Sequence, residues 1–372
     1  MAQVNVKRTS DLNIEQVTNL IYRLGSQRTV LVQGHMGSGK SSILKILADR
    51  LPTHRPVYFD CTTKDLGDIM IPKISADGSG TGGECVKFIP NEELGIHLDQ
   101  PIILMIDEFG KANRGVQNAL ALAMLEHKLS GYQFHPDSIV FATTNKGAEG
   151  VGDLLQDHHR NRICVVQMEK GTNEDWVPWA MLNNVEPSVI RFAQETPQLF
   201  QSYEDVKTPE DNLYIFHPQA QRDAFVTHRS LEAASDIVKL RDVLSGVELS
   251  AALSGTIGEA ATHDMMAFVL LADQLPTLDS IKNSPDTAIV PTHPDGAPNN
   301  VAISMIVYKA VGSIDRDWAS AWFKYMARLP KETQTLFIGG VSNKDHPQRQ
   351  FMVTYAKYTQ WCQENNYLYA PA

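Results

Sequence analysis

The stretch TVLVQGHMGSGKS at residues 29–41 joins a short apolar run to a glycine-rich turn. Its last eight residues match G-x-x-x-x-G-K-[ST] in full, and a helix is expected from about Lys40 to Leu51. Glycines in such a turn let backbone N–H groups point at a phosphate, and the helix N-terminus adds partial positive charge. A chance glycine-rich turn would lack the flanking strand and helix. The stretch therefore predicts a phosphate-binding loop in an α/β fold.

The loop also predicts how a nucleotide would be bound. Lys40 is expected to reach the β- and γ-phosphates, and the Ser41 hydroxyl to ligate Mg²⁺. ATP and Mg²⁺ are the expected cofactors, although no motif separates ATP from GTP. The predicted nucleotide-binding residues are Gly34, His35, Met36, Gly37, Ser38, Gly39, Lys40, Ser41 and Ser42.

Two further strand ends carry polar side chains suited to hydrolysis. The apolar run 102–106 is followed by Asp107 and Glu108. Asp107 is expected to hold the metal, directly or through water, and Glu108 to polarise the attacking water. The run Ser138–Ala142 is followed by Thr143-Thr144-Asn145, in which Asn145 could orient that water. A strand that exits into acidic surface, or an asparagine in a turn, would look similar in isolation.

Strands and helices alternate over the first 170 residues, which predicts a doubly wound parallel sheet. Helices are expected at 10–25, capped by Ser10 or Asp11, and at 113–129. Strands are expected at 29–32, 56–60, 102–106, 138–142 and 163–166. The glycine-rich segment 77–83, flanked by 69–74 and 85–89, is either a hairpin tip or a loop that touches a substrate.

Helical patterns dominate after residue 170. Helices are expected at 175–182, 188–196, 230–244 and 247–262, with a loop at 275–300. The segment 315–332 predicts an amphipathic helix that ends at Pro330 and either packs in a core or binds a partner. We expect three domains: an α/β core (1–172), a helical lid (173–274) and a C-terminal helical extension (275–372), which is a collar on a ring or an adaptor.

Composition narrows the function classes. The 372 residues carry a formal net charge of −10, which disfavours a dedicated nucleic-acid binder. The four cysteines form no CxxC pair, so a zinc site or disulfide framework is not expected. No apolar run is long enough to span a bilayer, and the N-terminus has no apolar leader region. We therefore expect a cytoplasmic protein without a membrane partner.

The three strand-end motifs in this order, followed by arginines and a helical region, resemble an AAA+ ATPase. Within that group the chain is similar to the MoxR branch, including relatives encoded by bacteriophages. Segments 175–180 and 189–197 resemble the lid entrance of that branch. The resemblance covers most of residues 20–270. It implies an α/β P-loop core followed by a helical lid and a further helical region.

The resemblance also implies roles for three arginines. Arg162 corresponds to the arginine that such proteins extend into a neighbour's ATP site, and Arg160 is the competing candidate. Arg229 matches the sensor-2 position of the lid. The family usually has Asp-Arg-Phe where this chain has Asn-Arg-Ile at 161–163, and often Pro-Arg where it has His-Arg at 228–229. Neighbouring His158 and His159 are taken as loop residues.

The leading hypothesis is an ATP hydrolase that forms a homo-oligomeric ring, expected to be a hexamer, and remodels or matures a protein client. Relatives often act on a partner with a von Willebrand A-like domain. A nucleic-acid motor on the same core is not favoured, because Lys64, Lys73 and Lys87 near the glycine-rich segment are balanced by acidic residues. A nucleotide switch with little hydrolysis is disfavoured by the presence of a full set of catalytic residues.

Overall fold

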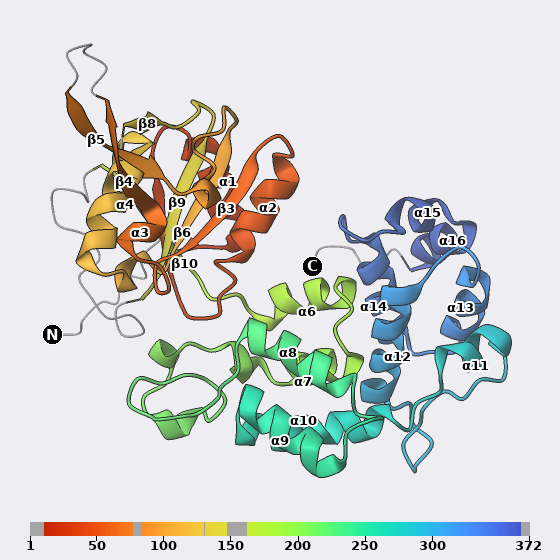
Figure 1. Cartoon of the computed structure of the whole chain (residues 1–372). Coiled ribbons are helices and arrows are strands. Elements are labelled where there is room, and N and C mark those ends of the chain that lie inside the picture. Colours follow the sequence, from red (N-terminus) through yellow and green to blue (C-terminus); the bar gives the residue numbers. More distant parts are fainter. Residues whose placement is uncertain (1–10, 77–82, 130, 147–161, 366–372) are drawn as a thin grey trace, which may run out of the picture. The chain divides into compact units, whose positions relative to one another are not determined.

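The computed structural model describes residues 11–76, 83–129, 131–146 and 162–365. The chain divides into two compact units, Met1–Lys170 and Gly171–Ala372. The first combines a parallel sheet with helices, and the second is helical (Figure 1). This confirms the predicted fold class in its architecture: an α/β core with a parallel sheet that carries the P-loop sequence, followed by helices up to the C-terminal region.

A six-stranded parallel sheet forms the centre of the first unit. Its strand order is β1-β10-β2-β9-β6-β3. The glycine-rich loop leaves the sheet from β2, whose direct neighbours are β9 and β10. The strands are β1 (Asp11–Leu12), β2 (Val30–Gly34), β3 (Arg55–Asp60), β6 (Ile102–Asp107), β9 (Ile139–Asn145) and β10 (Cys164–Met168).

Helices cover both faces of this sheet. Alternate residues of β2 point to opposite faces, so Val30 and Val32 pack with one set of helices and Leu31 with the other. The first set is α1 (Ile14–Leu24) and α2 (Ser42–Arg50). The second contains α3 (Leu66–Ile69) and α4 (Arg114–Glu126), with the short turns η1 (Glu92–Leu94) and η2 (Phe109–Lys111). Burial on both faces explains why β6 is apolar up to its last residue.

Several predicted boundaries are wrong. Asn13 caps α1, in a capping box with Gln16, and Asp11 belongs to β1. Helix α4 ends at Glu126 because His127 adopts a left-handed conformation (φ 48°). The chain then forms a small hairpin, β7 (Lys128–Leu129) with β8 (Tyr132–Gln133). Helix α2 begins two residues later than expected.

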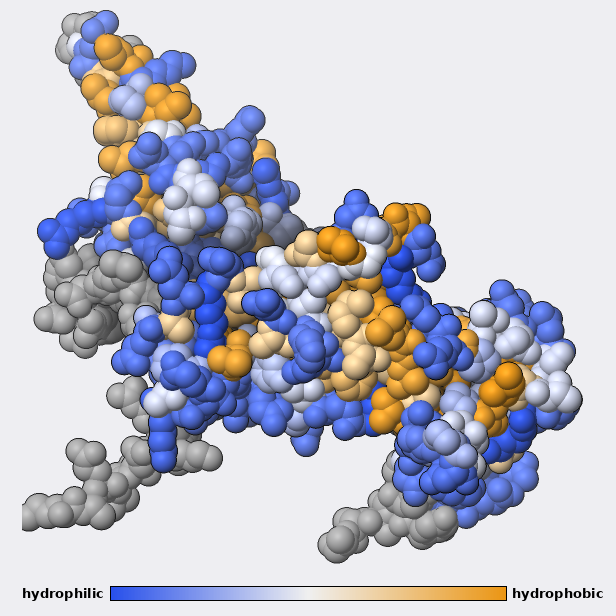
Figure 2. Space-filling view, turned by 90° about the horizontal axis from the view of Figure 1, so that it is seen from below, coloured by the Kyte–Doolittle hydropathy of each residue, from blue (hydrophilic) through white to orange (hydrophobic). Residues whose placement is uncertain are grey.

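An antiparallel hairpin projects from the first unit (Figure 1). It consists of β4 (Met70–Ala76) and β5 (Glu84–Pro90), which pair with each other in a two-stranded sheet. Hydrophobic side chains remain exposed along it, and Figure 2 shows them on the arm beside the grey tip. Segment 77–82, most of the predicted glycine-rich loop, lies outside the described residues.

The second unit is built from helices around one hydrophobic core. That core runs from Trp176 to Trp361, so it includes parts of both the expected lid and the expected C-terminal extension. The three-domain division stays a prediction. The helices are α6 (Asn173–Leu182), α7 (Pro187–Glu195), α8 (His228–Val238), α9 (Gly246–Ile257), α10 (Glu259–Ala272), α11 (Leu278–Asn283), α12 (Asn300–Ser313), α13 (Ala319–Met326), α14 (Lys331–Ser342), α15 (Arg349–Thr354) and α16 (Ala356–Glu364), with turns η3 (Pro197–Phe200), η4 (Tyr203–Asp205) and η5 (Pro209–Asp211).

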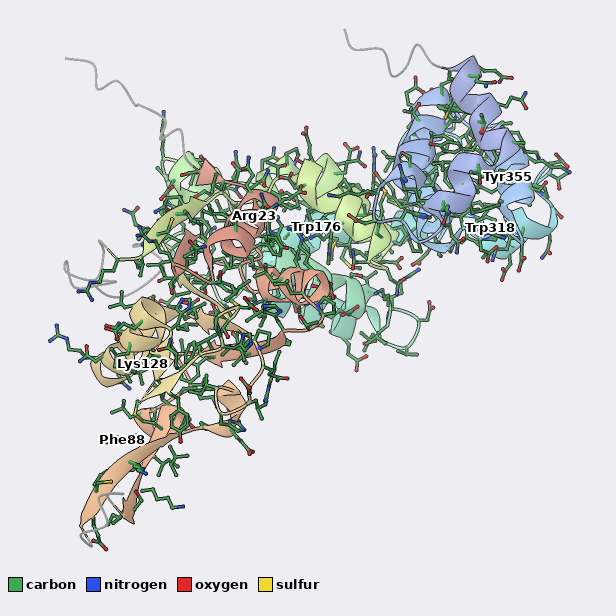
Figure 3. The ribbon with its side chains drawn as sticks, turned by 90° about the horizontal axis from the view of Figure 1, so that it is seen from above. Arg23, Phe88, Lys128, Trp176, Trp318 and Tyr355 are labelled. Carbon is green, nitrogen blue, oxygen red and sulfur yellow. The ribbon has the colours of Figure 1, made fainter. Side chains whose placement is uncertain are left out.

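Three expectations for this unit need correction. The single helix predicted at 247–262 is two helices, because Gly258 breaks it with φ 86° and ψ 160°. The loop expected at 275–300 contains α11. The helix predicted to end at Pro330 ends at Met326. Its packing interpretation is confirmed: Trp318, labelled in Figure 3, and Trp322 are buried, with ring centroids 5.8 Å apart.

Two further observations concern the chain as a whole. All four cysteines are free. Among the described residues, no helix combines the length and the apolar character that crossing a membrane requires.

Gly258 should be hard to replace. Its φ and ψ are open essentially to glycine alone, and an added Cβ would lie 2.8 Å from the carbonyl oxygen of Ala224. We expect Gly258→Ala to lower the free energy of unfolding by about 2 kcal/mol. Tryptophan fluorescence during urea unfolding measures this, because all five tryptophans lie in the second unit.

Gly255 provides the matched control. It lies inside α9, and a Cβ there would meet no atom within 4 Å. Gly255→Ala should leave stability unchanged or raise it by up to about 1 kcal/mol, because alanine favours a helix. Equal effects of the two substitutions would contradict a special backbone role for Gly258.

Candidate functional site

The glycine-rich loop between β2 and α2 has the conformation that its sequence predicts. Gly37 and Gly39 adopt left-handed backbone angles (φ 69° and 88°), which a side chain would disfavour. The loop is closed by the Ser42 N–H, which donates to the Gly39 carbonyl at 2.9 Å. Ser41 stands at the N-cap of α2, and its side chain makes no capping hydrogen bond. The loop thus leads directly into a helix N-terminus.

Lys40 is buried at the centre of the site. Only 6% of it is exposed, and its ammonium group donates to the carbonyls of Gly34 (2.9 Å) and His35 (2.7 Å). It also donates to Oδ1 of Asn145 at 2.9 Å. This last contact follows from the sheet, since Gly34 and Asn145 are paired at the ends of β2 and β9. The structure therefore brings the predicted phosphate-binding lysine and the predicted water-orienting asparagine together.

Glu108 joins the same network. The Asn145 amide nitrogen donates to Glu108 Oε1 at 2.9 Å, and Lys111 forms an ion pair with Oε2 at 3.1 Å. Glu108 has a left-handed backbone (φ 53°, ψ 36°), which is unusual for a residue with a side chain. Such strain persists only where the surrounding structure enforces it, and it is frequent at functional sites.

Asp107 ends β6 and is 7% exposed. Its carboxylate accepts hydrogen bonds from the Tyr58 hydroxyl at 2.8 Å and from the Thr143 hydroxyl. The backbone N–H of Glu108 donates to it at 3.1 Å. The side chain is thereby held in one orientation at the carboxyl edge of the sheet, where ligands of open α/β folds bind.

The residues present fit a nucleotide with Mg²⁺. Ser38 Oγ is buried in the loop without a hydrogen-bond partner, as expected for a group that faces a phosphate. In the described part of the chain, no cluster of three or more His, Cys, Asp or Glu forms a cage for a metal. Mg²⁺ is commonly held by one or two protein oxygens and by substrate phosphates, so Ser41 and Asp107 are a sufficient donor set.

Two of the three predicted arginines lie within the described residues. Arg162 is exposed and lies two positions before the first residue of β10. Arg160, with His158 and His159, lies outside the described residues. Arg229 is exposed in the first turn of α8, in the second unit. All three arginine roles stay predictions.

Three residues of this network were not predicted from the sequence to belong to the site. Thr143 could have been found, because it lies two positions before Asn145 on a strand and therefore shares its face. Lys111 lies three residues after Glu108, a spacing that brings side chains together in a turn. Tyr58 could not have been found, since its contact with Asp107 depends on the pairing of β3 with β6.

Comparisons with known proteins add little to this geometry. No protein-family model matches the sequence, and no curated protein matches it. Among the solved structures that match is a protein from Cytophaga hutchinsonii described as a "putative ATPase". It is 14% identical, with a TM-score of 0.29, over 66% of this chain and 81% of that chain. The functional assignment therefore depends on the geometry of the site itself.

The thiol of Cys61 lies beside the site and should be unreactive. Burial raises its pKa to about 12, and the negative charges of Asp60, Asp107 and Glu108 add to this. At a given pH its thiolate is then about a thousandfold scarcer than in the unfolded chain, whose thiol ionises near pH 9. We expect iodoacetamide to leave Cys61 unmodified in the native protein between pH 8 and about pH 10 and to alkylate it in urea.

Peptide mass spectrometry measures this protection, and Cys85 on the hairpin, which is partly exposed, is an internal control that should react. Alkylation of Cys61 at the same rate in native and unfolded protein would contradict the assignment.

Proposed function

We propose that the protein is a Mg²⁺-dependent ATP hydrolase that works as a hexameric ring and remodels or matures a protein partner in the cytoplasm. The observation that carries the proposal is the cluster at the ends of β2, β6 and β9. Lys40, Asn145 and Glu108 form a continuous hydrogen-bonded chain there, with Asp107 beside it. These are the groups that phosphoryl transfer to water requires.

Each side chain has a defined task in this mechanism. Lys40 and the N–H groups of the loop hold the phosphates and stabilise their negative charge. Asp107 and Ser41 would hold Mg²⁺, which when bound neutralises charge on the phosphates. Glu108 accepts a proton from the attacking water, which Asn145 orients. Asn145 contacts Oε1 of Glu108 and Lys111 contacts Oε2, and each oxygen has a second acceptor position for that water.

Assembly supplies the remaining positive charge in this proposal. Arg162 is exposed just before β10, which lies directly beside the phosphate-binding strand β2. An arginine that a neighbouring copy inserts can accelerate phosphoryl transfer by about 10³-fold or more. Arg162 is the preferred candidate and Arg160 the second. MoxR-like relatives suggest a client with a von Willebrand A-like domain.

The β4–β5 hairpin is proposed to contact the client. Ile74 and Phe88 lie on one face of it, because Ile74 pairs with Val86 and Phe88 follows two residues later. Their side chains are 68% and 45% exposed. Figure 3 shows Phe88 on this arm. Apolar side chains exposed on a projecting hairpin suit an extended, apolar segment of a partially unfolded protein.

Glu108→Gln tests the hydrolase. The amide keeps the size of the side chain but cannot accept the proton, so kcat should fall by at least about 10²-fold. ATP binding should be retained. For the wild type, the specific activity of steady-state ATP hydrolysis should rise with protein concentration, because the site is shared between copies. Glu93→Gln, on an exposed carboxylate paired with Lys64, is the control and should have wild-type activity.

Mixing variants tests the shared site. Glu108→Gln and Arg162→Ala proteins should each be inactive, and a mixture should regain part of the activity, because some interfaces then combine one intact Glu108 with one intact Arg162. No recovery, together with activity that is independent of concentration, would contradict a site formed by two copies.

The hairpin can be tested separately. We expect casein, an unfolded probe, to stimulate ATP hydrolysis in the wild type. The double substitution Ile74→Ser and Phe88→Ser should abolish most of that stimulation, because it removes the exposed apolar side chains, and should change basal turnover by less than about twofold. Val247→Ser, on an 81% exposed valine of α9, is the control. Undiminished stimulation in the double variant would contradict a client-binding role.

A further inference from the structure

The carboxylate of Asp107 is held by donors from three different elements. Tyr58 on β3 donates to Oδ2 at 2.8 Å. Thr143 on β9 donates to Oδ1, which also accepts the backbone N–H of Glu108 at 3.1 Å. Neither hydroxyl belongs to the phosphate-binding loop, and neither lies on the strand that carries Asp107. The carboxylate is thus fixed from both neighbouring strands of β6.

The geometry of the sheet explains both contacts. Strand β3 pairs with β6 in parallel, with Tyr58 opposite Met105 and Asp60 opposite Asp107. Tyr58 and Met105 point to the same face as Asp107, since residues two apart on a strand share a face. The long tyrosine side chain then reaches forward along the sheet to the carboxylate. Thr143 reaches it from the other side, through β9.

The donors occupy most of the hydrogen-bond acceptor positions of the Asp107 carboxylate. A carboxylate has about four acceptor positions, two on each oxygen. The two contacts to Oδ1 occupy that oxygen, whereas the Tyr58 hydroxyl leaves one position of Oδ2 for a further ligand. Asp107 is thus arranged to bind a cation, or a water on that cation, through Oδ2 alone. Mg²⁺ suits such a site, because it keeps most of its water and demands well-oriented oxygen ligands.

We propose that Tyr58 and Thr143 are positioning residues for Mg²⁺ and that they orient Asp107 so that Oδ2 faces the metal of the nucleotide complex. The proposal rests on the proposed function, since it needs a nucleotide and a metal at this site. Removal of either hydroxyl frees the carboxylate to rotate, and groups that orient metal ligands in this way typically contribute 10- to 100-fold to metal affinity or activity.

Mn²⁺, which is detected by electron paramagnetic resonance, is the probe for the metal, and the full chain is titrated in the presence of a non-hydrolysable ATP analogue. Tyr58→Phe removes one oxygen and keeps the ring, which β3 still holds in place. We expect it to weaken Mn²⁺ binding about tenfold or more. Binding of the nucleotide without metal, measured in EDTA, should change by less than about twofold.

Two further variants separate positioning from general damage. Thr143→Val keeps the shape of the side chain and should weaken Mn²⁺ binding in the same direction, and Thr143→Ser, which restores a hydroxyl, should recover most of it. Tyr132→Phe, on an exposed tyrosine of the β7–β8 hairpin, is the control and should bind Mn²⁺ as the wild type does. Circular dichroism checks that each variant is folded.

The outcomes are distinguishable from failure of the proposed function. Wild-type Mn²⁺ affinity in folded Tyr58→Phe and Thr143→Val would overturn the inference while leaving the hydrolase intact. Absence of nucleotide-dependent Mn²⁺ binding in the wild type would overturn both. Loss of nucleotide binding in EDTA by Tyr58→Phe would also overturn the inference, because the tyrosine would then act on the phosphate loop and not on the metal.

Discussion

The buried ammonium group of Lys40 is the constraint on which the site depends. A buried cation is costly unless oxygens surround it, so its surroundings must be specified closely. The carbonyls of Gly34 and His35 bind it from the loop, and Asn145 binds it from the adjacent strand. The loop, β2 and β9 are therefore tied together before any phosphate arrives. Bound phosphate would compete for the same ammonium group. Binding would then change the contact of Asn145 with Lys40 and, through Asn145, the contact with Glu108.

Much of the fold could be predicted from the sequence, because the apolar runs that form β2, β6 and β9 and the glycine-rich loop are local signals. Element boundaries were less predictable. The single helix expected at 247–262 failed at Gly258, where a Cβ would lie 2.8 Å from the carbonyl oxygen of Ala224. The end of α4 failed at His127, which adopts a left-handed conformation without being glycine. At Gly258 the glycine itself is a local signal for the break, whereas at His127 the residue type does not predict the left-handed conformation.

The site, like the fold, could be predicted from the sequence only in part. Lys40, Asp107, Glu108 and Asn145 could be predicted as a cluster because each lies at or shortly after the end of a strand, and the carboxyl ends of parallel strands meet at one edge. The partners that hold these groups could not, since Tyr58 meets Asp107 only through the register of β3 with β6. The arginine roles stay predictions, because they concern a second copy of the chain or the other unit. Sequence patterns thus predict the polar groups at the strand ends better than the groups that hold them in place.

The projecting hairpin exposes apolar side chains that could cause aggregation, and other residues of the same hairpin oppose it. Among the described residues, β4 and β5 pair only with each other, so their outer edges and exposed apolar side chains could pair with the same strands of another molecule. Lys73 and Lys87 are paired across the hairpin, so each copy presents two positive charges side by side. Pro72 lacks a backbone N–H and lies one residue from that pair. Charge repulsion and a missing donor would hinder stacking of hairpins, so their apolar side chains can stay exposed to water at high protein concentration.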